Sequence, residues 1–320
     1  MRWSTYFDEP VETMPTAWLR RLEAERLAGQ ARHCVEASNA YRLRLGIGEV
    51  TPERLAQVPL LRAEQVASAQ DADPPLGELL CADLVDVVRL ALVEADGSDT
   101  LAVAYTEQDL ATAATLGARA LWAAGLRPSD VVVDLLGVDP ALGLLGAAVL
   151  SPSPGAERSL LDSWARVGAT ALIATVERAG ALAEAAGRAS MSLHELGLRR
   201  LLLQAGGAEG EREELSARWG VAATCVHGHP ALWPLFAAEC EERDGLHFLA
   251  HGALLLEIVP PGETAAVPLE EGAEGEAVLT HLDREATPLV RFRTGEDVLV
   301  VGTDCECGRT GIRYRLGGGA

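Results

Sequence analysis

Short apolar segments alternate with helical patterns through the middle of this chain, and this alternation limits the fold more than any other feature. Four segments are predicted to be strands because they are short, apolar and bounded by turn residues: 84–93, 131–136, 171–174 and 201–203. Between them, Thr106 and Asp109 have the capping-box spacing that opens a helix towards Ala124, and residues 141–150 predict a second helix of small residues. The pattern predicts an α/β fold of mostly parallel sheets flanked by helices.

The two ends of the chain differ from its middle. Residues 1–80 have helical spacing, with Pro52 at the first position of a capped helix and a turn-rich linker at 71–77. After Asp244, turn clusters separate four short predicted strands: 254–259, 277–282, 289–293 and 297–301. We therefore predict an N-terminal helical region (1–80), α/β subdomains (81–243) and a small antiparallel β subdomain resembling a barrel (244–320).

The basic residues restrict the chemistry that this chain can perform. All 27 basic residues among the 320 are arginines, so no lysine is available as a Schiff base, a general base or a phosphate ligand. The 47 acidic residues give a net charge of −20, which repels nucleic acid and anionic membranes. We expect neither a nucleic-acid nor a membrane partner.

The compartment and the size of the core follow from three further observations. The first ten residues contain no apolar signal core, and the longest apolar stretch, 141–150, is about half of what spans a bilayer. Six cysteines are too few for a disulfide scaffold. The hydrophobic share of 48% suffices for a substantial core. We expect a cytoplasmic protein.

A family pattern is visible in the last third of the chain. The stretches that carry it are CEERDGLH at 240–247, EGEAVLT at 274–280, PLVRFRTG at 288–295 and CECGRT at 305–310. Residues 12–15 and the pairs at 105–106 and 109–110 agree with it upstream. In these stretches the chain resembles the phenylacetate–CoA ligase branch of the adenylate-forming (AMP-binding) enzymes.

The resemblance implies a fold and a missing part. The fold is the N-terminal domain of an adenylate-forming enzyme, with helix-flanked, mostly parallel sheets and a small C-terminal β-barrel-like subdomain. In such enzymes a mobile C-terminal lid domain with the catalytic lysine normally follows. Because the chain ends near residue 317, where the family's hinge lies, we expect this lid to be absent.

The nucleotide-binding positions that the resemblance implies are altered. The phosphate loop corresponds to residues 93–99 (VEADGSD), where three carboxylates replace hydroxyls and a lysine; each close like-charge contact costs on the order of 1–4 kcal/mol. The alternative interpretation is a solvated hairpin turn. The position of the magnesium carboxylate falls on Ala231 or Leu232, and the ribose acid on Glu296. We therefore expect neither ATP nor Mg²⁺ as a cofactor.

A zinc site is the second feature that the resemblance implies. Cys240, His247, Cys305 and Cys307 match positions that hold a zinc ion in some relatives, and four such ligands suit a closed, structural site. The alternative is a set of reduced thiols beside an unrelated histidine. His251 is a weaker candidate as fourth ligand. Cys34, Cys81 and Cys225 are expected to be small buried hydrophobic residues.

The remaining candidates surround the centre of the family's active site. His227 and His229 are proposed as catalytic residues because imidazoles transfer protons near neutral pH. Either could equally be a hydrogen-bonded structural histidine. The predicted substrate-binding residues are these: Trp233, Phe236, Gly206, Gly207 and Glu296. Core packing is the alternative for the aromatic residues, for Phe248 beside them, and a strand end for the glycines.

Three functions remain open at this point. The first is a biosynthetic enzyme of secondary metabolism that acts without ATP, by acid/base chemistry, on a small acyl or aromatic, polyketide-like substrate. The second is a non-catalytic binding or partner protein, as a homodimer or in a complex with a pathway enzyme. The third is an AMP-forming acyl-CoA ligase fragment with residual activity.

Overall fold

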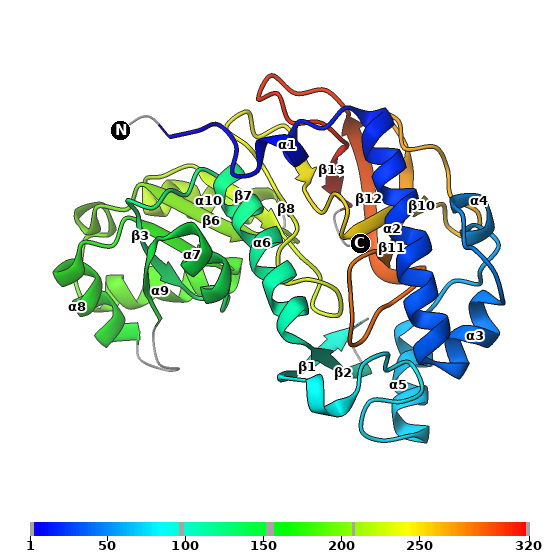
Figure 1. The fold of residues 1–320 in the computed structure, drawn as a ribbon. Coiled ribbons are helices and arrows are strands. Elements are labelled where there is room, and N and C mark those ends of the chain that lie inside the picture. The colour runs from blue at the N-terminus through cyan, green and yellow to red at the C-terminus, as the bar shows by residue number, and fades with distance from the viewer. Residues whose placement is uncertain (1–2, 96–98, 152–156, 207–208, 318–320) are drawn as a thin grey trace.

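One mixed sheet of eleven strands runs through the molecule (Figure 1). This computed structural model describes residues 3–95, 99–151, 157–206 and 209–317. The strand order is β10-β11-β12-β13-β9-β8-β7-β6-β5-β3-β4. The bounds are β3 Val131–Asp134, β4 Ala148–Leu150, β5 Ala171–Ala174, β6 Arg200–Gln204, β7 Ala223–His227, β8 Ala237–Ala238, β9 Leu246–Phe248, β10 Leu254–Val259, β11 Glu274–His281, β12 Phe292–Gly302 and β13 Arg313–Leu316.

The sheet has a parallel half and an antiparallel half. Strands β4, β3, β5, β6 and β7 are parallel to one another, whereas β7 pairs antiparallel with β8 and the pairing stays antiparallel as far as β10. The predicted α/β class is confirmed. A separate small barrel at 244–320 is not, because its strands continue the same sheet through β8 and β9.

Helices cover the sheet and form the N-terminal region. Their bounds are α1 Glu9–Glu12, α2 Thr16–Ala37, α3 Asn39–Leu45, α4 Pro52–Leu55, α5 Ala63–Ala72, α6 Glu107–Ala123, α7 Asp139–Leu145, α8 Glu157–Val167, α9 Val176–Arg188 and α10 Glu209–Trp219, with short 3₁₀ turns at Leu84–Asp86 and Leu193–Leu196. The capping box at Thr106 and Asp109 forms as predicted, since each residue's side chain accepts the other's backbone N–H. None of the described helices has both the length and the apolar run needed to cross a bilayer.

Three strand or helix predictions were wrong in part. Residues 84–86 form a 3₁₀ turn, and β1 begins only at Arg89. The helix predicted for 141–150 ends at Leu145, because Gly146 adopts a left-handed conformation (φ 79°), and β4 follows. Of the strand predicted for 289–293, only 292–293 form, as the start of β12, because Arg291 has φ 53° and its guanidinium is buried against the carbonyls of Ala56 and Val58.

A two-stranded hairpin stands apart from the main sheet. It consists of β1 (Arg89–Ala95) and β2 (Asp99–Tyr105), which pair antiparallel beside α5 (Figure 1). The Gln70 side chain of α5 binds both the backbone N–H and the carbonyl of Ala102, and so it occupies the outer edge of β2. Residues 96–98, which belong to the predicted phosphate loop, lie outside the described residues.

Candidate functional site

Three side chains from three strands, two of them buried and the third partly exposed, form a hydrogen-bonded chain at the centre of the sheet. His227 ends β7, Glu296 lies in β12 and Tyr314 lies in β13. The Tyr314 hydroxyl is 2.7 Å from His227 Nδ1, and His227 Nε2 is 3.2 Å from Glu296 Oε1. A phenol that donates to Nδ1 and an Nε2–H that donates to the carboxylate satisfy all three groups at once. We call this chain of side chains the His227 relay.

The environment sets the protonation of both ends of the relay. Burial raises the pKa of Tyr314 well above its usual value, and the negative charge of Glu296 raises it further. Burial alone would raise the pKa of Glu296, but the hydrogen bond from His227 and the charges of His227 and His229 outweigh it, so that the pKa lies below its usual value. At neutral pH the relay therefore has a neutral phenol at one end and a carboxylate at the other.

His229 has a different environment from His227. Its Nδ1 accepts the backbone N–H of Ala231 at 3.2 Å, and its Nε2 lies 3.3 Å from the Thr294 carbonyl. Both ring nitrogens thus contact backbone atoms, one in the loop after β7 and one in β12. This arrangement is typical of a structural histidine, the alternative that the sequence left open for this residue.

The loop after β7 is tightly packed and carries no carboxylate at the expected metal position. A Cβ on Gly228 would lie 1.9 Å from the Pro234 carbonyl oxygen, so that only glycine fits there. Ala231 and Leu232, the two candidates for the magnesium position, are both fully buried and apolar. A hard cation such as Mg²⁺ needs oxygen ligands, which neither of these side chains supplies.

The predicted apolar pocket is almost completely filled. Phe236 and Phe248 pack beside His227 and line a cavity of only about 10 Å³, together with Leu256 and Glu296. Trp233 is fully buried elsewhere, with its ring against His281 and against the guanidinium of Arg284. These contacts match the core-packing alternative for the aromatic residues.

A larger cavity of about 410 Å³ opens at the carboxyl ends of β6 and β7. Gly206 lines it, whereas Gly207 lies outside the described residues. Its polar wall includes Arg212, which binds Glu239 through two 2.8 Å hydrogen bonds. The carboxyl ends of parallel strands are the usual position of a ligand in α/β sheets. Cys225, predicted to be buried, is partly exposed here, so that prediction holds only for Cys34 and Cys81.

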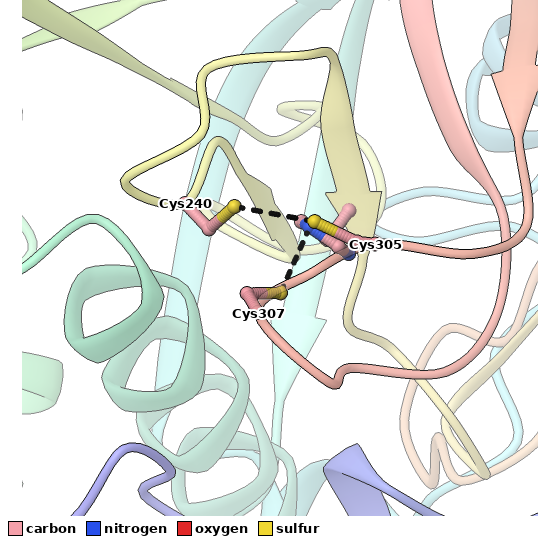
Figure 2. Close-up of side chains that lie close together, drawn as sticks. Cys240, Cys305 and Cys307 are labelled. Carbon is pink, nitrogen blue, oxygen red and sulfur yellow. Dashed lines mark hydrogen bonds between the residues drawn. The ribbon is translucent and has the colours of Figure 1, made fainter.

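The four predicted zinc ligands meet at one point. Their ligand atoms all lie within 4.8 Å of one another, and this is the one such group that the described part of the chain contains. Figure 2 shows the three cysteine side chains gathered at this point. Cys240 follows β8, His247 lies in β9, and Cys305 and Cys307 lie in the loop between β12 and β13. Arg313 joins the two turns that carry the cysteines, because it binds Asp244 at 2.6 Å and the Asp304 carbonyl at 2.6 Å.

The spacing of these atoms fits tetrahedral coordination. Cys240 Sγ and Cys305 Sγ are 3.7 Å apart, and Cys307 Sγ is 3.5 Å from His247 Nε2. Bonds of about 2.3 Å to sulfur and about 2.0 Å to nitrogen at tetrahedral angles would place such atoms about 3.8 and 3.5 Å apart. A hydrogen bond with Cys307 and, to a lesser extent, burial raise the pKa of Cys240, whereas the hydrogen bonds from Cys240 and His247 lower the pKa of Cys307. The residues therefore fit a zinc ion.

Sequence reasoning missed two residues that organise these sites. Tyr314 is part of the His227 relay and Arg313 holds the cysteine loops, yet both lie in the short segment 313–316, which was interpreted only as a chain end. The alternation of Arg313, Tyr314 and Arg315 in front of Leu316 is the strand signal that could have found them.

Comparisons with known proteins agree with this geometry. No protein-family model matches the chain. The phenylacetate–coenzyme A ligase of Thermus thermophilus is 30% identical over 325 residues, which cover 96% of this chain and 71% of that protein. The enzyme of the same name from Escherichia coli is 26% identical, with 89% and 68% covered.

Solved structures show the same fold. A 2-hydroxyisobutyryl-CoA ligase, solved with an acyl-adenylate, has a TM-score of 0.87 at 23% identity and covers 98% of this chain and 69% of its own. A long-chain-fatty-acid-CoA ligase from Archaeoglobus fulgidus has a TM-score of 0.53 at 15% identity, with 72% and 52% covered. Identity of this order supports the fold alone. The Thermus relative, together with the motifs in 240–310, shows that the chain belongs to the phenylacetate–coenzyme A ligase family.

Proposed function

We propose that this family member no longer forms an acyl-adenylate. The single observation that carries the proposal is the apolar, fully buried pair Ala231 and Leu232 at the position of the metal carboxylate. The absence of lysine from the sequence and the acidic composition of residues 93–99 support it, because a polyanionic nucleotide needs cationic and hydroxyl partners. Glu296, at the ribose position, is already bound to His227.

The reaction that this site supports best is acid/base chemistry without ATP. Glu296 is the end of the His227 relay that is nearest to solvent, with a side chain 31% exposed, and its lowered pKa keeps it a carboxylate at neutral pH. His227 donates its Nε2–H to that carboxylate and Tyr314 fixes the ring from the other side, so that the base has one orientation. We propose a cytoplasmic enzyme of secondary metabolism that removes a proton from, or donates a proton to, an acyl or aromatic substrate.

The proposal is tested by substitution in the native host. His227→Ala and Glu296→Gln should each reduce the pathway product by about 10²–10⁴-fold, the usual contribution of a positioned base. His229→Ala, whose nitrogens bind backbone, is the matched variant and should act only through the amount of folded protein. Unchanged product per folded protein in both His227→Ala and Glu296→Gln would overturn the acid/base role.

A second candidate is a binding or partner protein without catalysis. The cavity of about 410 Å³ favours a binding function, because it is lined both by apolar residues, Leu203 and Leu246, and by the ion pair of Arg212 and Glu239. Affinity capture of the tagged chain from its host, followed by turnover assays of the isolated chain, distinguishes the two functions. A captured pathway enzyme without turnover supports binding, and turnover by the isolated chain supports catalysis.

We also propose a structural zinc ion at Cys240, His247, Cys305 and Cys307. Such an ion would hold the turn after β8 to the loop before β13. The purified chain should contain about one zinc per molecule by elemental analysis, and Cys307→Ser should lose it. Cys225→Ser, which changes a thiol outside the cluster, should keep the metal. Absence of zinc from chain purified without chelator would contradict the assignment.

A further inference from the structure

Residues 3–14 lie across the β12–β13 loop, which carries two of the proposed zinc ligands, and we call them the N-terminal strap. The Tyr6 hydroxyl donates to the backbone carbonyl of Cys307 at 3.0 Å, although the two residues are 301 positions apart in the chain. The Arg309 guanidinium donates to the Thr5 carbonyl at 2.9 Å. The strap therefore contacts one of the proposed metal ligands directly, through the backbone of Cys307.

A buried carboxylate joins the strap to the same loop. Glu12 Oε2 accepts a hydrogen bond from Arg309 Nε at 2.7 Å, and both side chains are almost completely buried. Glu12 Oε1 accepts the backbone N–H groups of Phe7 and Asp8 at 2.8 and 2.7 Å. The backbone N–H of Thr310 donates to the Glu12 carbonyl at 2.9 Å. This part of the strap and the β12–β13 loop therefore form one hydrogen-bonded unit.

The Tyr6 side chain fits closely against the loop. A Cβ on Gly308 would lie 2.3 Å from the Tyr6 hydroxyl oxygen, and Gly308 has φ 80°, a conformation that other residues rarely adopt. The Arg309 guanidinium lies 5.2 Å from the centre of the Tyr6 ring, which is a cation–π contact. Glycine at position 308 therefore allows Tyr6 to reach the Cys307 carbonyl.

The proposed metal ligands attach the same loop to the sheet. Cys307 Sγ is 3.5 Å from His247 Nε2 in β9, and it accepts a hydrogen bond from the backbone N–H of Arg309. An ion bound by the four ligands would fix Cys307 in place. It would thereby also fix the carbonyl that Tyr6 binds and the backbone of Arg309.

Helix α6 holds the strap from its other side. Arg119 Nη2 is 3.0 Å from Asp8 Oδ2, and Trp122 Nε1 donates to the Ser4 carbonyl at 3.1 Å. The strap thus spans two elements, α6 and the β12–β13 loop. Loss of the contacts with the loop should therefore loosen the strap without detaching it.

We infer that the N-terminal strap is an outer part of the metal site, in which Tyr6 is a positioning residue for Cys307. The inference rests on the proposed zinc ion and not on the His227 relay. Groups that bind and orient metal ligands without touching the ion change metal affinity by about 10–100-fold. Coupling between two binding events is reciprocal, so the ion should strengthen the attachment of the strap by the same factor by which the strap strengthens binding of the ion.

The zinc affinity of Tyr6→Phe tests the inference from the side of the strap. The substitution removes one hydroxyl and keeps the ring, so it should weaken zinc binding by about tenfold, the lower end of that range. Competition with a chromophoric chelator measures the affinity. Tyr41→Phe is the matched control, because Tyr41 is a buried tyrosine whose hydroxyl also donates to a backbone carbonyl, that of Pro288, outside the cluster. This control should keep the wild-type affinity.

The outcomes separate this inference from the zinc proposal. If the wild-type chain binds zinc and Tyr6→Phe binds it equally well, the role of the strap is overturned and the zinc ion stands. A wild-type chain without zinc affinity would contradict both. An equal loss of affinity in Tyr41→Phe would show general destabilisation and would also overturn the role of Tyr6.

Hydrogen exchange tests the coupling from the side of the ion. In the zinc-bound chain, the backbone N–H groups of Phe7 and Asp8 are bonded to Glu12 and should exchange slowly. Removal of zinc by a chelator should accelerate exchange in peptides that cover the strap by about 10–100-fold. Helix α9, which packs on the parallel half of the sheet, is the internal reference and should not change. Equal exchange of the strap with and without zinc, or an acceleration that α9 shares, would overturn the inference.

Discussion

Glu23, a partly buried residue of α2, shows how one side chain ties stability to pH. Burial raises its pKa to about 7, against a smaller opposite effect of Arg20. The folded state therefore holds a proton that the unfolded chain releases near pH 4.5. Its contribution to stability is complete below about pH 4.5 and is lost as the pH rises through 7.

We predict that Glu23→Gln stabilises the protein at pH 8 and not at pH 4. The gain should be about 1–3 kcal/mol in the free energy of unfolding, because Gln keeps the shape of a neutral Glu without the cost of a buried charge. Urea unfolding at both pH values measures it. Glu25→Gln, on the exposed face of the same helix and paired with Arg21, should not show this gain. Equal effects of Glu23→Gln at both pH values would contradict the burial of this carboxyl.

The residues of the candidate site were predictable to different degrees. The cluster of Cys240, His247, Cys305 and Cys307 could be predicted from the family motif, because the motif places these three cysteines and the histidine together. The surroundings of His227 could not, because its two partners come from β12 and β13, nearly 70 and 90 positions away in the chain. Long-range pairing of strands brings these side chains together, and the sequence around each residue does not reveal which distant strand will lie beside it.

Among the elements, α1 and the loop before β13 are joined by a buried ion pair. Arg309 Nε donates to Glu12 Oε2 at 2.7 Å, and both side chains are almost completely buried. The other oxygen of Glu12 accepts the backbone N–H groups of Phe7 and Asp8. The same pair therefore organises the N-terminal segment and attaches it to the loop that carries Cys305 and Cys307.

Removal of one partner of this pair should be costly. We predict that Arg309→Met destabilises the protein by about 3–5 kcal/mol, since it leaves an uncompensated carboxylate in the core. Glu12→Gln/Arg309→Met should be less destabilising than Arg309→Met alone, because no buried charge remains. Thermal unfolding of the wild type and the two variants gives the comparison, and a more stable single variant would contradict the explanation.

The helix caps offer a matched pair of substitutions. Thr106 caps α6, and its hydroxyl also donates to Glu285 at 2.6 Å, whereas Thr175 caps α9 through Arg178 N–H. Thr175→Ala should cost about 1 kcal/mol, the usual value for an N-cap. Thr106→Ala should cost more, because it also leaves Glu285 without its hydroxyl donor. Chemical unfolding of both variants measures the difference, and equal costs would contradict the second role of Thr106.

Strands were predicted most accurately where the local pattern was complete. Residues 254–259 and 171–174 match β10 and β5 to the residue, because each is apolar and ends at a turn or polar residue. The prediction failed at 141–150, where one run of small apolar residues contains both a helix and a strand separated by Gly146. Composition is uniform across that boundary, so only the backbone angle of the glycine marks it.

At the scale of the whole molecule, the family and the α/β class could be read from the sequence, but the continuity of the sheet could not. The change from helical alternation to short strands near residue 244 predicted a separate subdomain. In the structure, two short strands, β8 and β9, join the parallel half to the antiparallel half. Strands of two or three residues have almost no local pattern, so tertiary pairing decides their existence.

The proposed loss of adenylation rests on the apolar pair Ala231 and Leu232 at the position of the metal carboxylate, and a measurement of ATP binding tests it most directly. Isothermal titration of the purified chain with ATP and Mg²⁺ should give no saturable heat at millimolar nucleotide, while the Thermus thermophilus phenylacetate–coenzyme A ligase serves as the positive control under the same conditions. Saturable binding with a micromolar Kd would contradict the proposal and would support residual ligase activity.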